Sequence, residues 1–169
     1  YLLARAQKLG DKGRRIAARR AAPEVLRSRG DKEGAREALM LLLSDGDDAE
    51  ALAILVQDSA ERGDHQERVE LLRRLGALTK NPADKVALAL QEAELLAGDL
   101  DDVEGAIERY EAIFKNLDPK NRRALRAIAD LQDRRDNAEG AADALEREIL
   151  LADGDERVEI AQRLATIYE

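Results

Sequence analysis

The sequence contains no cysteine and no tryptophan, and several other residue types are rare. Among its 169 residues there are 3 prolines and 1 histidine, and aromatic residues make up 2%. The absence of cysteine excludes disulfides and thiolate metal sites. Because aromatic residues are so scarce, a hydrophobic core must be built from leucine, isoleucine, valine and alanine.

Long apolar runs are also missing. No purely apolar run is longer than that of residues 38–43, which residues 51–56 equal in length, whereas a helix needs roughly 20 such residues to cross a bilayer. The first residues show no signal-peptide pattern, and no stretch of alternating β-branched residues predicts a strand. Membrane insertion is therefore not expected. The sequence does not determine the cellular location, for which cytoplasmic is the default expectation.

Alanine, leucine and charged residues dominate what is present. Hydrophobic residues make up 44% of the chain and charged residues 38%, a composition typical of helices with solvated outer faces. The net charge of −8 is uneven: residues 1–30 hold nine Lys or Arg against two Asp or Glu, a net +7, which leaves −15 for the rest. The basic segment is interpreted either as a solvated helix face or as a salt-sensitive binding surface.

An internal repeat is visible in the sequence. The triplet at residues 33–35, Glu-Gly-Ala, recurs at residues 104–106, a shift of 71, and Gln91 corresponds to Gln162 at the same shift. Half of this shift is close to the 34-residue period of the tetratricopeptide repeat. The chain resembles that family at its signature positions: Ala106, Tyr110, Leu125, Ile128, Ala129, Ala141, Leu145, Leu164, Ala165 and Tyr168.

This resemblance implies an all-α fold, a right-handed α-solenoid of about nine or ten helices in antiparallel hairpins. It also implies a single domain over residues 1–169, part of a longer bacterial repeat protein. We expect a short helix over 2–9, hairpins over 12–44, 48–79, 83–116 and 121–152, and a partial repeat over 156–168. The Gly-Asp pairs at 30–31, 63–64 and 98–99 predict turns, and Pro23 predicts a kink or break near residues 19–22.

The resemblance also implies a protein-interaction scaffold, because first helices in this family line a concave groove that grips a partner segment. The matching positions in this sequence are Arg20, Glu24, Arg27, Glu50, Gln57, Glu61, Leu88, Gln91, Glu92, Leu95, Arg126, Asp130, Arg134, Gln162 and Arg163. The family's carboxylate clamp uses Lys and Asn, and no Asn stands at the corresponding positions, which argues against such a clamp. Leu88 and Leu95 predict an apolar patch in the middle of the groove.

The alternative hypothesis is a structural spacer that associates with itself through its last helix, where Ile160, Leu164 and Ile167 would lack a covering helix. An enzyme is not expected, because no phosphate loop, nucleophile elbow or zinc spacing occurs. The acidic residues 45–50 do not fit a calcium loop, and His65 has no nucleophile nearby. No cofactor or metal is expected. Nucleic-acid binding is not expected either, since the basic segment has a single aromatic residue on which a base could stack.

Overall fold

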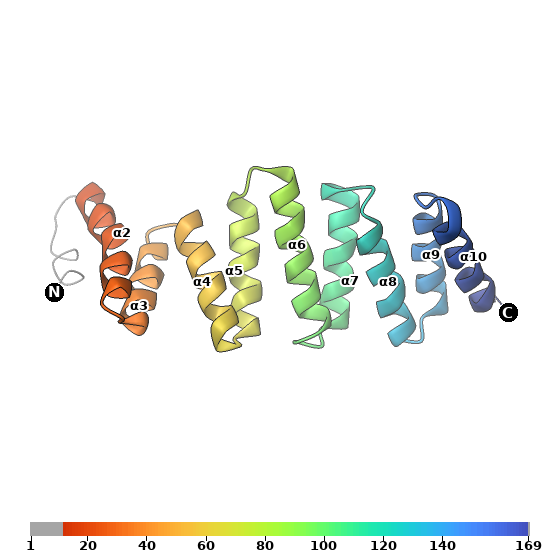
Figure 1. Ribbon diagram of the computed structural model, residues 1–169, viewed down its shortest axis with the longest axis horizontal. Helices are drawn as coiled ribbons and strands as arrows, with labels where there is room; N and C mark the ends of the chain where they lie inside the picture. Colours follow the sequence, from red (N-terminus) through yellow and green to blue (C-terminus); the bar gives the residue numbers. More distant parts are fainter. Residues whose placement is uncertain (1–11, 169) are drawn as a thin grey trace. The chain divides into compact units, whose positions relative to one another are not determined.

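The chain forms helices throughout the part that the computed structural model describes, which is residues 12–168 for the backbone and 20–168 for the side chains. The predicted helix over 2–9 lies outside these residues. Within them no strand occurs, so the predicted all-α hairpin fold is confirmed (Figure 1). The helices are α2 (Lys12–Ser28), α3 (Lys32–Leu43), α4 (Ala49–Arg62), α5 (His65–Leu78), α6 (Pro82–Ala97), α7 (Val103–Ala112), the π-helix η1 (Ile113–Leu117), α8 (Arg122–Arg134), α9 (Ala138–Ile149) and α10 (Gly154–Tyr168).

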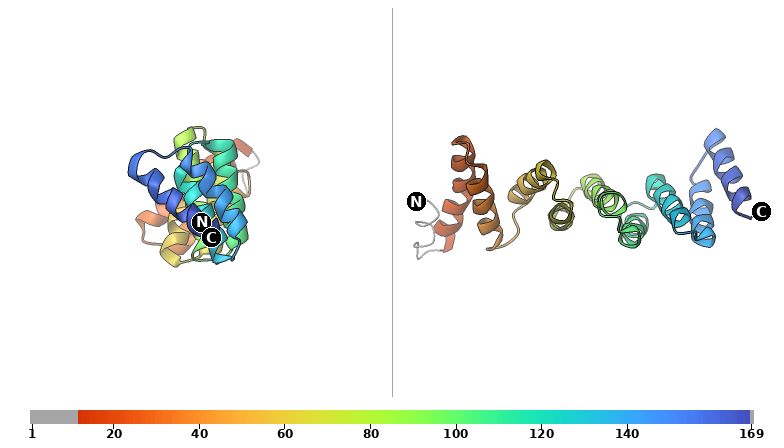
Figure 2. Two further views of the ribbon diagram at one scale, coloured as in Figure 1. Left: turned by 90° about the vertical axis from the view of Figure 1, so that its right-hand side faces the viewer. Right: turned by 90° about the horizontal axis from the view of Figure 1, so that it is seen from below.

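Two compact units divide the chain. Unit 1 covers Tyr1–Leu78 and unit 2 covers Thr79–Glu169. In unit 1 the hairpins α2–α3 and α4–α5 meet through α3 and α4, and in unit 2 the hairpins α6–α7 and α8–α9 meet through α7 and α8 (Figure 2). Helix α10 packs on α9. That the two units continue as one solenoid stays a prediction.

Short polar side chains start most of the helices. The carboxylates of Asp31 and Asp102 accept hydrogen bonds at 2.9 Å from the backbone N–H groups of Gly34 and Gly105. The side chain of Asn137 does the same for Gly140 at 3.1 Å. These caps satisfy N–H groups that the first turn of a helix leaves free. Residues 139–141 are a third Glu-Gly-Ala triplet. The comparison at a shift of 71 residues did not include this triplet, which follows the second one after about one period of the tetratricopeptide repeat.

Turns occur at all three predicted Gly-Asp pairs, and at two of them the glycine is left-handed. Gly30 and Gly63 have φ of 77° and 70°, the left-handed backbone that glycine adopts without strain. At residues 98–99 the predicted turn between α6 and α7 is present, but Gly98 has φ of −102° and is not left-handed. Asp101, with φ of 50°, takes the left-handed position instead, and Asp102 then caps α7.

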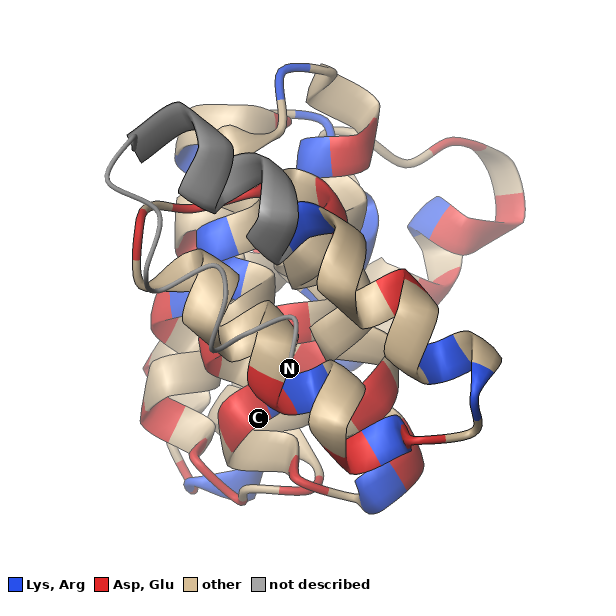
Figure 3. Ribbon diagram, turned by 90° about the vertical axis from the view of Figure 1, so that its left-hand side faces the viewer, with Lys and Arg blue, Asp and Glu red and all other residues tan. Residues whose placement is uncertain are grey.

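Each unit has its own apolar core of aliphatic side chains. In unit 1, Leu52 and Leu55 are fully buried against leucines of α3 and α5. In unit 2 the signature residues of α7, α8 and α9 are all buried, namely Ala106, Tyr110, Leu125, Ile128, Ala129, Ala141 and Leu145. Basic and acidic residues are interspersed along the helices outside these cores (Figure 3). Among the described residues, no helix is long and apolar enough to cross a membrane.

Because of Tyr110, the stability of unit 2 is expected to depend on pH in the alkaline range. Burial of its ring, with a smaller effect of the Glu94 carboxylate, raises the pKa of its hydroxyl from 10.0 to about 12. The unfolded chain therefore loses this proton at lower pH than the folded chain, and stability falls as pH rises through this window. We expect the free energy of unfolding to drop by about 2–3 kcal/mol from this group between pH 10 and 12.

The measurement for Tyr110 is denaturant unfolding across this pH range, compared with Tyr110→Phe. The variant lacks the titrating hydroxyl but keeps the ring, so its stability is expected to fall less steeply. Equal slopes for the two proteins would contradict the assignment.

Candidate functional site

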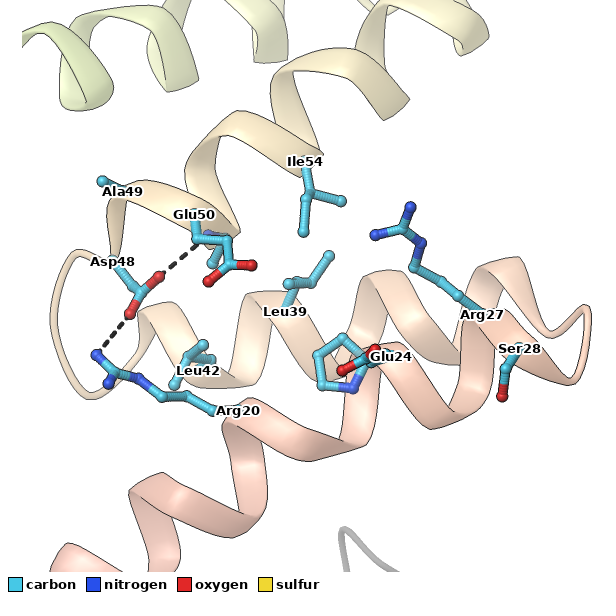
Figure 4. A pocket seen from close by; sticks show the side chains of 12 residues that line it. Arg20, Glu24, Arg27, Ser28, Leu39, Leu42, Asp48, Ala49, Glu50 and Ile54 are labelled. Atoms are coloured by element: carbon cyan, nitrogen blue, oxygen red, sulfur yellow. Dashed lines mark hydrogen bonds and ion pairs between the residues drawn. The ribbon is translucent and has the colours of Figure 1, made fainter.

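A groove runs across one face of unit 1 between α2 and α4, over α3. One hollow of about 750 Å³ is lined by Arg20, Pro23, Glu24, Arg27, Ser28, Leu39, Leu42, Asp48, Ala49, Glu50, Ala51 and Ile54. A second, of about 600 Å³, is lined by Arg27, Lys32, Ala35, Arg36, Leu39, Glu50, Ala53, Ile54, Leu55, Gln57, Asp58 and Glu61. The two share Arg27, Leu39, Glu50 and Ile54. We call the two hollows together the α2–α4 groove, and Figure 4 shows the first of them.

The floor of the α2–α4 groove is apolar and fixed. Leu39 and Leu42 of α3 are 4% and 6% exposed and belong to the core cluster of unit 1, and Ile54 of α4 packs against that cluster. Because these side chains are held by the core beneath them, the floor is preformed. An apolar floor with charged walls is the usual composition of a protein-binding surface, since burial of the floor supplies affinity and the walls supply specificity.

Helix α2 forms one wall of the groove without a break. It runs from Lys12 to Ser28 with Pro23 inside it, so the predicted break is wrong. The predicted kink agrees with the change of direction that its ribbon makes beside Arg20 (Figure 4). Proline removes a backbone hydrogen bond and crowds the preceding turn, which explains a bend at that place.

An ion pair closes one end of the groove. The guanidinium of Arg20 donates to the carboxylate of Asp48 at 2.7 Å, joining the start of α4 to α2 (Figure 4). Asp48 also accepts a hydrogen bond at 3.1 Å from the backbone N–H of Ala51 and so caps α4. Arg20 thus serves to hold the walls of the groove together.

Three exposed charged side chains in the groove have no partner among the described residues. Glu24 and Arg27 on α2 and Glu50 on α4 make no hydrogen bond or ion pair with any residue that the structure describes. In Figure 4, Glu24 and Glu50 lie beside the apolar floor and Arg27 extends toward Ile54. Unpaired charges beside an apolar floor are available to a partner without the cost of breaking an existing pair.

The other end of the groove carries the two remaining positions predicted in unit 1. Gln57 and Glu61 are both exposed on α4, and the Gln57 amide donates to the Glu61 carboxylate at 3.4 Å. Lys32 of α3 lies 3.7 Å from the same carboxylate. The structure therefore brings together all the predicted groove residues of unit 1.

In unit 2 the predicted groove charges are already paired. Arg126 donates to Glu148 at 2.8 Å, Arg134 to Asp101 at 3.0 Å and Arg163 to Asp130 at 2.7 Å. Each pair links two different helices or a helix and a loop. Arg134 and Arg163 connect neighbouring hairpins, and Arg126 connects the two helices of one hairpin. A partner would have to displace an existing ion pair to reach any of the three.

The predicted apolar patch on α6 is wrong. Leu95 is 6% exposed and Leu88 is half-buried. Glu92, on the same helix face by its spacing, is 1% exposed and lies 2.7 Å from the guanidinium of Arg109. This face packs inward, whereas Gln91 on the neighbouring face is exposed. The family pattern marks which helix lines a groove but not which of its faces the packing leaves open.

In α9 the chain departs from the family pattern at Glu148, whose carboxylate is buried. Glu148, at a position where the family usually has alanine, is 1% exposed and accepts hydrogen bonds from Arg126, while the Arg122 guanidinium lies 3.5 Å away. Arg122 also donates to Glu156 at 2.6 Å. That hydrogen bond lowers the pKa of Glu156, which keeps the carboxylate charged at lower pH. The cluster ties α8, α9 and α10 together.

The exposed face of α10 is not the one predicted. Ile160 is 5% exposed, and Leu164 and Ile167 are half-buried, because this side of the helix packs on α9. The exposed apolar residues are instead Val158 at 55% and Tyr168 at 66%. Val158 lines an open hollow of about 500 Å³ with Ile149, Gly154, Arg157, Ala161, Gln162 and Ala165.

Acidic residues of the segment 45–50 make local structural contacts, and the single histidine lies at the start of a helix. Asp47 accepts a hydrogen bond at 3.0 Å from the Arg74 guanidinium, and Asp48 caps α4. His65 is the first residue of α5. Within the described part of the chain, no three His, Cys, Asp or Glu side chains are grouped as metal ligands.

Comparison with known proteins shows the fold. No protein-family model matches the chain, and no curated relative does. A crystal structure of MamA, a tetratricopeptide-repeat protein, is similar over 86% of this chain and 82% of its own, with 19% identity and a TM-score of 0.53. A second MamA crystal structure matches 90% of this chain and 80% of its own at 19% identity and a TM-score of 0.54. The fragment of MamA from residue 41 to its end, from Desulfovibrio magneticus RS-1, matches 90% and 82% at 20% identity and a TM-score of 0.52.

The chain therefore has a fold like that of tetratricopeptide repeats, as its signature residues predicted. Sequence reasoning missed the floor residues of the groove, Leu39, Leu42 and Ile54. Their helical spacing predicts a core face, and only the structure shows that part of this face borders an open hollow.

Proposed function

We propose that the chain is a protein-interaction module whose α2–α4 groove binds a segment of another protein. The observation that carries the proposal is the combination of an apolar floor with three unpaired charges, Glu24, Arg27 and Glu50. The corresponding charges in unit 2 are held in ion pairs, which favours unit 1 as the binding surface. No catalytic role is proposed for any residue.

The shape of the groove favours an amphipathic helix as the bound segment. Two helices form its walls and a third forms its floor, which is the arrangement in which a helix lays its apolar face into a groove. The segment would place apolar side chains on Leu39, Leu42 and Ile54. It would present a basic side chain to Glu24 or Glu50 and an acidic one to Arg27, because unpaired charges of opposite sign complete each other at the rim.

Site-specific photocrosslinking tests the proposal. Gln57 lines the groove in unit 1, and Gln91 is an exposed glutamine on a first helix of unit 2. A photoreactive amino acid at Gln57 is expected to capture a defined partner segment in cells, whereas the same group at Gln91 is expected to capture little.

A groove variant tests whether the capture at Gln57 takes place in the α2–α4 groove. Capture at Gln57 should be lost when Ala53, an exposed residue of the groove wall, is changed to arginine. Stronger capture at Gln91 than at Gln57, or capture that survives Ala53→Arg, would contradict the proposal.

A further inference from the structure

The groove charges that have no partner among the described residues are distributed over both walls. Glu24 on α2 and Glu50 on α4 line the same hollow, so each wall contributes one carboxylate. In Figure 4, Glu50 lies on the α4 side of Leu39 and Glu24 on its α2 side. Arg27 follows Glu24 on α2 by three residues, which places the two on neighbouring turns of one helix face. The groove therefore offers a carboxylate on either side of its floor and a guanidinium one turn further along.

The other charged side chains of the groove already occur as ion pairs. They are Arg20–Asp48, Lys32–Glu61 and Arg36–Asp58, with N–O distances of 2.7, 3.7 and 3.3 Å. Each pair combines one positive and one negative group, so the three pairs together are neutral. The charge left for a partner is that of two carboxylates and one guanidinium, a net −1. Available negative charge is thus present on both walls, whereas available positive charge is confined to Arg27 on α2.

A single cationic side chain suits the space between the two carboxylates. A guanidinium has five N–H donors and an ammonium has three, so either group has enough donors for two carboxylates. The methylene stem of Lys or Arg is apolar and packs on a floor such as Leu39 while its charged head reaches the polar groups beside it. An acidic side chain in the same place would add a third negative charge to Glu24 and Glu50. Because a bound helix excludes water and so strengthens this repulsion, acidic residues are rejected there.

We infer that the groove selects helices in which one Lys or Arg is seated between Glu24 and Glu50 and one Asp or Glu a single turn away is seated on Arg27. This inference rests on the proposed function of the groove, and it adds that the two carboxylates share one basic side chain. Since Glu24 and Arg27 are three residues apart on α2, the complementary pair on a helix lying along α2 is three or four residues apart as well. The floor then supplies affinity, and these three charges determine specificity.

Selection from a library of displayed helices tests the inference with the full chain as bait. Each probe is an alanine-rich helix of about 20 residues, long enough to be helical on its own. Leucines are fixed along one face, and other positions on and beside that face are randomised among Lys, Glu, Gln and Ala. Selected helices are expected to carry Lys at one position and Glu three or four residues away. We expect this pair to be enriched at least about tenfold over the pair Glu and Glu at the same positions.

Charge reversal in the bait shows whether the named residues cause this preference. In the double variant Glu24→Lys, Glu50→Lys, the preferred residue at the Lys position is expected to become Glu. In Arg27→Glu, the preference one turn away is expected to change from Glu to Lys. The matched control is Glu33→Lys, Glu37→Lys, which makes the same change in net charge at two exposed residues of α3 outside the groove. Circular dichroism checks that each variant is folded.

Three results would overturn the inference. The first is a set of selected helices with no preference between Lys and Glu, and the second is a Lys preference that survives Glu24→Lys, Glu50→Lys. The third is a preference that the α3 control changes just as much. The proposed function stands in each case if Ala53→Arg releases the selected helices. Helices that bind Ala53→Arg as well as they bind the wild-type chain would contradict the proposed function itself.

Discussion

Replacing Arg126 with methionine is expected to lower the free energy of unfolding of unit 2 by about 3 kcal/mol. The Glu148 carboxylate is 1% exposed, and the Arg126 guanidinium is its closest partner at 2.8 Å. Removing that partner leaves a buried charge with the Arg122 guanidinium at 3.5 Å. A buried carboxylate that loses its partner is strongly destabilising, because the cost of removing it from water is no longer offset.

Two further variants make this prediction specific. Arg123→Met is the control, because the neighbouring Arg123 and its partner Glu94 are 68% and 42% exposed, and an exposed ion pair contributes under about 1 kcal/mol. Adding Glu148→Leu to Arg126→Met removes the stranded charge and is expected to recover most of the loss. Urea unfolding followed by circular dichroism measures all three. Equal effects of Arg126→Met and Arg123→Met would mean that Glu148 is not stabilised as described.

Replacing Leu52 with alanine is expected to destabilise unit 1 by about 2–5 kcal/mol. Leu52 is 0% exposed in α4 and packs in the cluster that includes Leu39 and Leu42 of the groove floor. Its removal creates a cavity directly behind the surface that a partner would bury. The loss is therefore expected both in the stability of unit 1 and in the affinity of the groove.

Hydrogen exchange distinguishes this effect from a general loss of stability. Protection of the backbone amides of α3 and α4 is expected to fall most, since local opening reflects local packing. Leu78→Ala is the matched control, because Leu78 of α5 is 39% exposed and its truncation is expected to cost less than about 1 kcal/mol. A Leu52→Ala protein with unchanged protection in α3 and α4 would show that the floor does not depend on this core.

The sequence predicted the helices well because the determinants of a helix are local. Asp31 and Asp102 cap the helices that follow them, and Gly30 and Gly63 end the helices before them. The signature residues of α7 to α9 are buried, because their spacing places them on one side of each helix. Repetition then added evidence, since the same local pattern occurs in several hairpins.

The sequence predicted the site less well because the site depends on contacts between helices. Arg126, Arg134 and Arg163 have the same appearance in the sequence as Arg27. The first three are ion-paired, whereas Arg27 has no ion pair with a residue that the structure describes. The partners Glu148, Asp101 and Asp130 lie 22 to 33 residues away. Likewise, the solvent-exposed side of α10 contains Val158 rather than Ile160, because the packing of α10 on α9 decides which side is covered.

The most direct test of the central claim compares two alanine-to-arginine changes in the binding of the segment captured at Gln57. Ala53 lines the groove of unit 1, and Ala87 is an exposed alanine near the same position of the first helix of unit 2. Titration calorimetry is expected to show at least about a tenfold loss of affinity for Ala53→Arg and little change for Ala87→Arg. A loss for Ala87→Arg with none for Ala53→Arg would contradict the assignment of the binding surface to the α2–α4 groove.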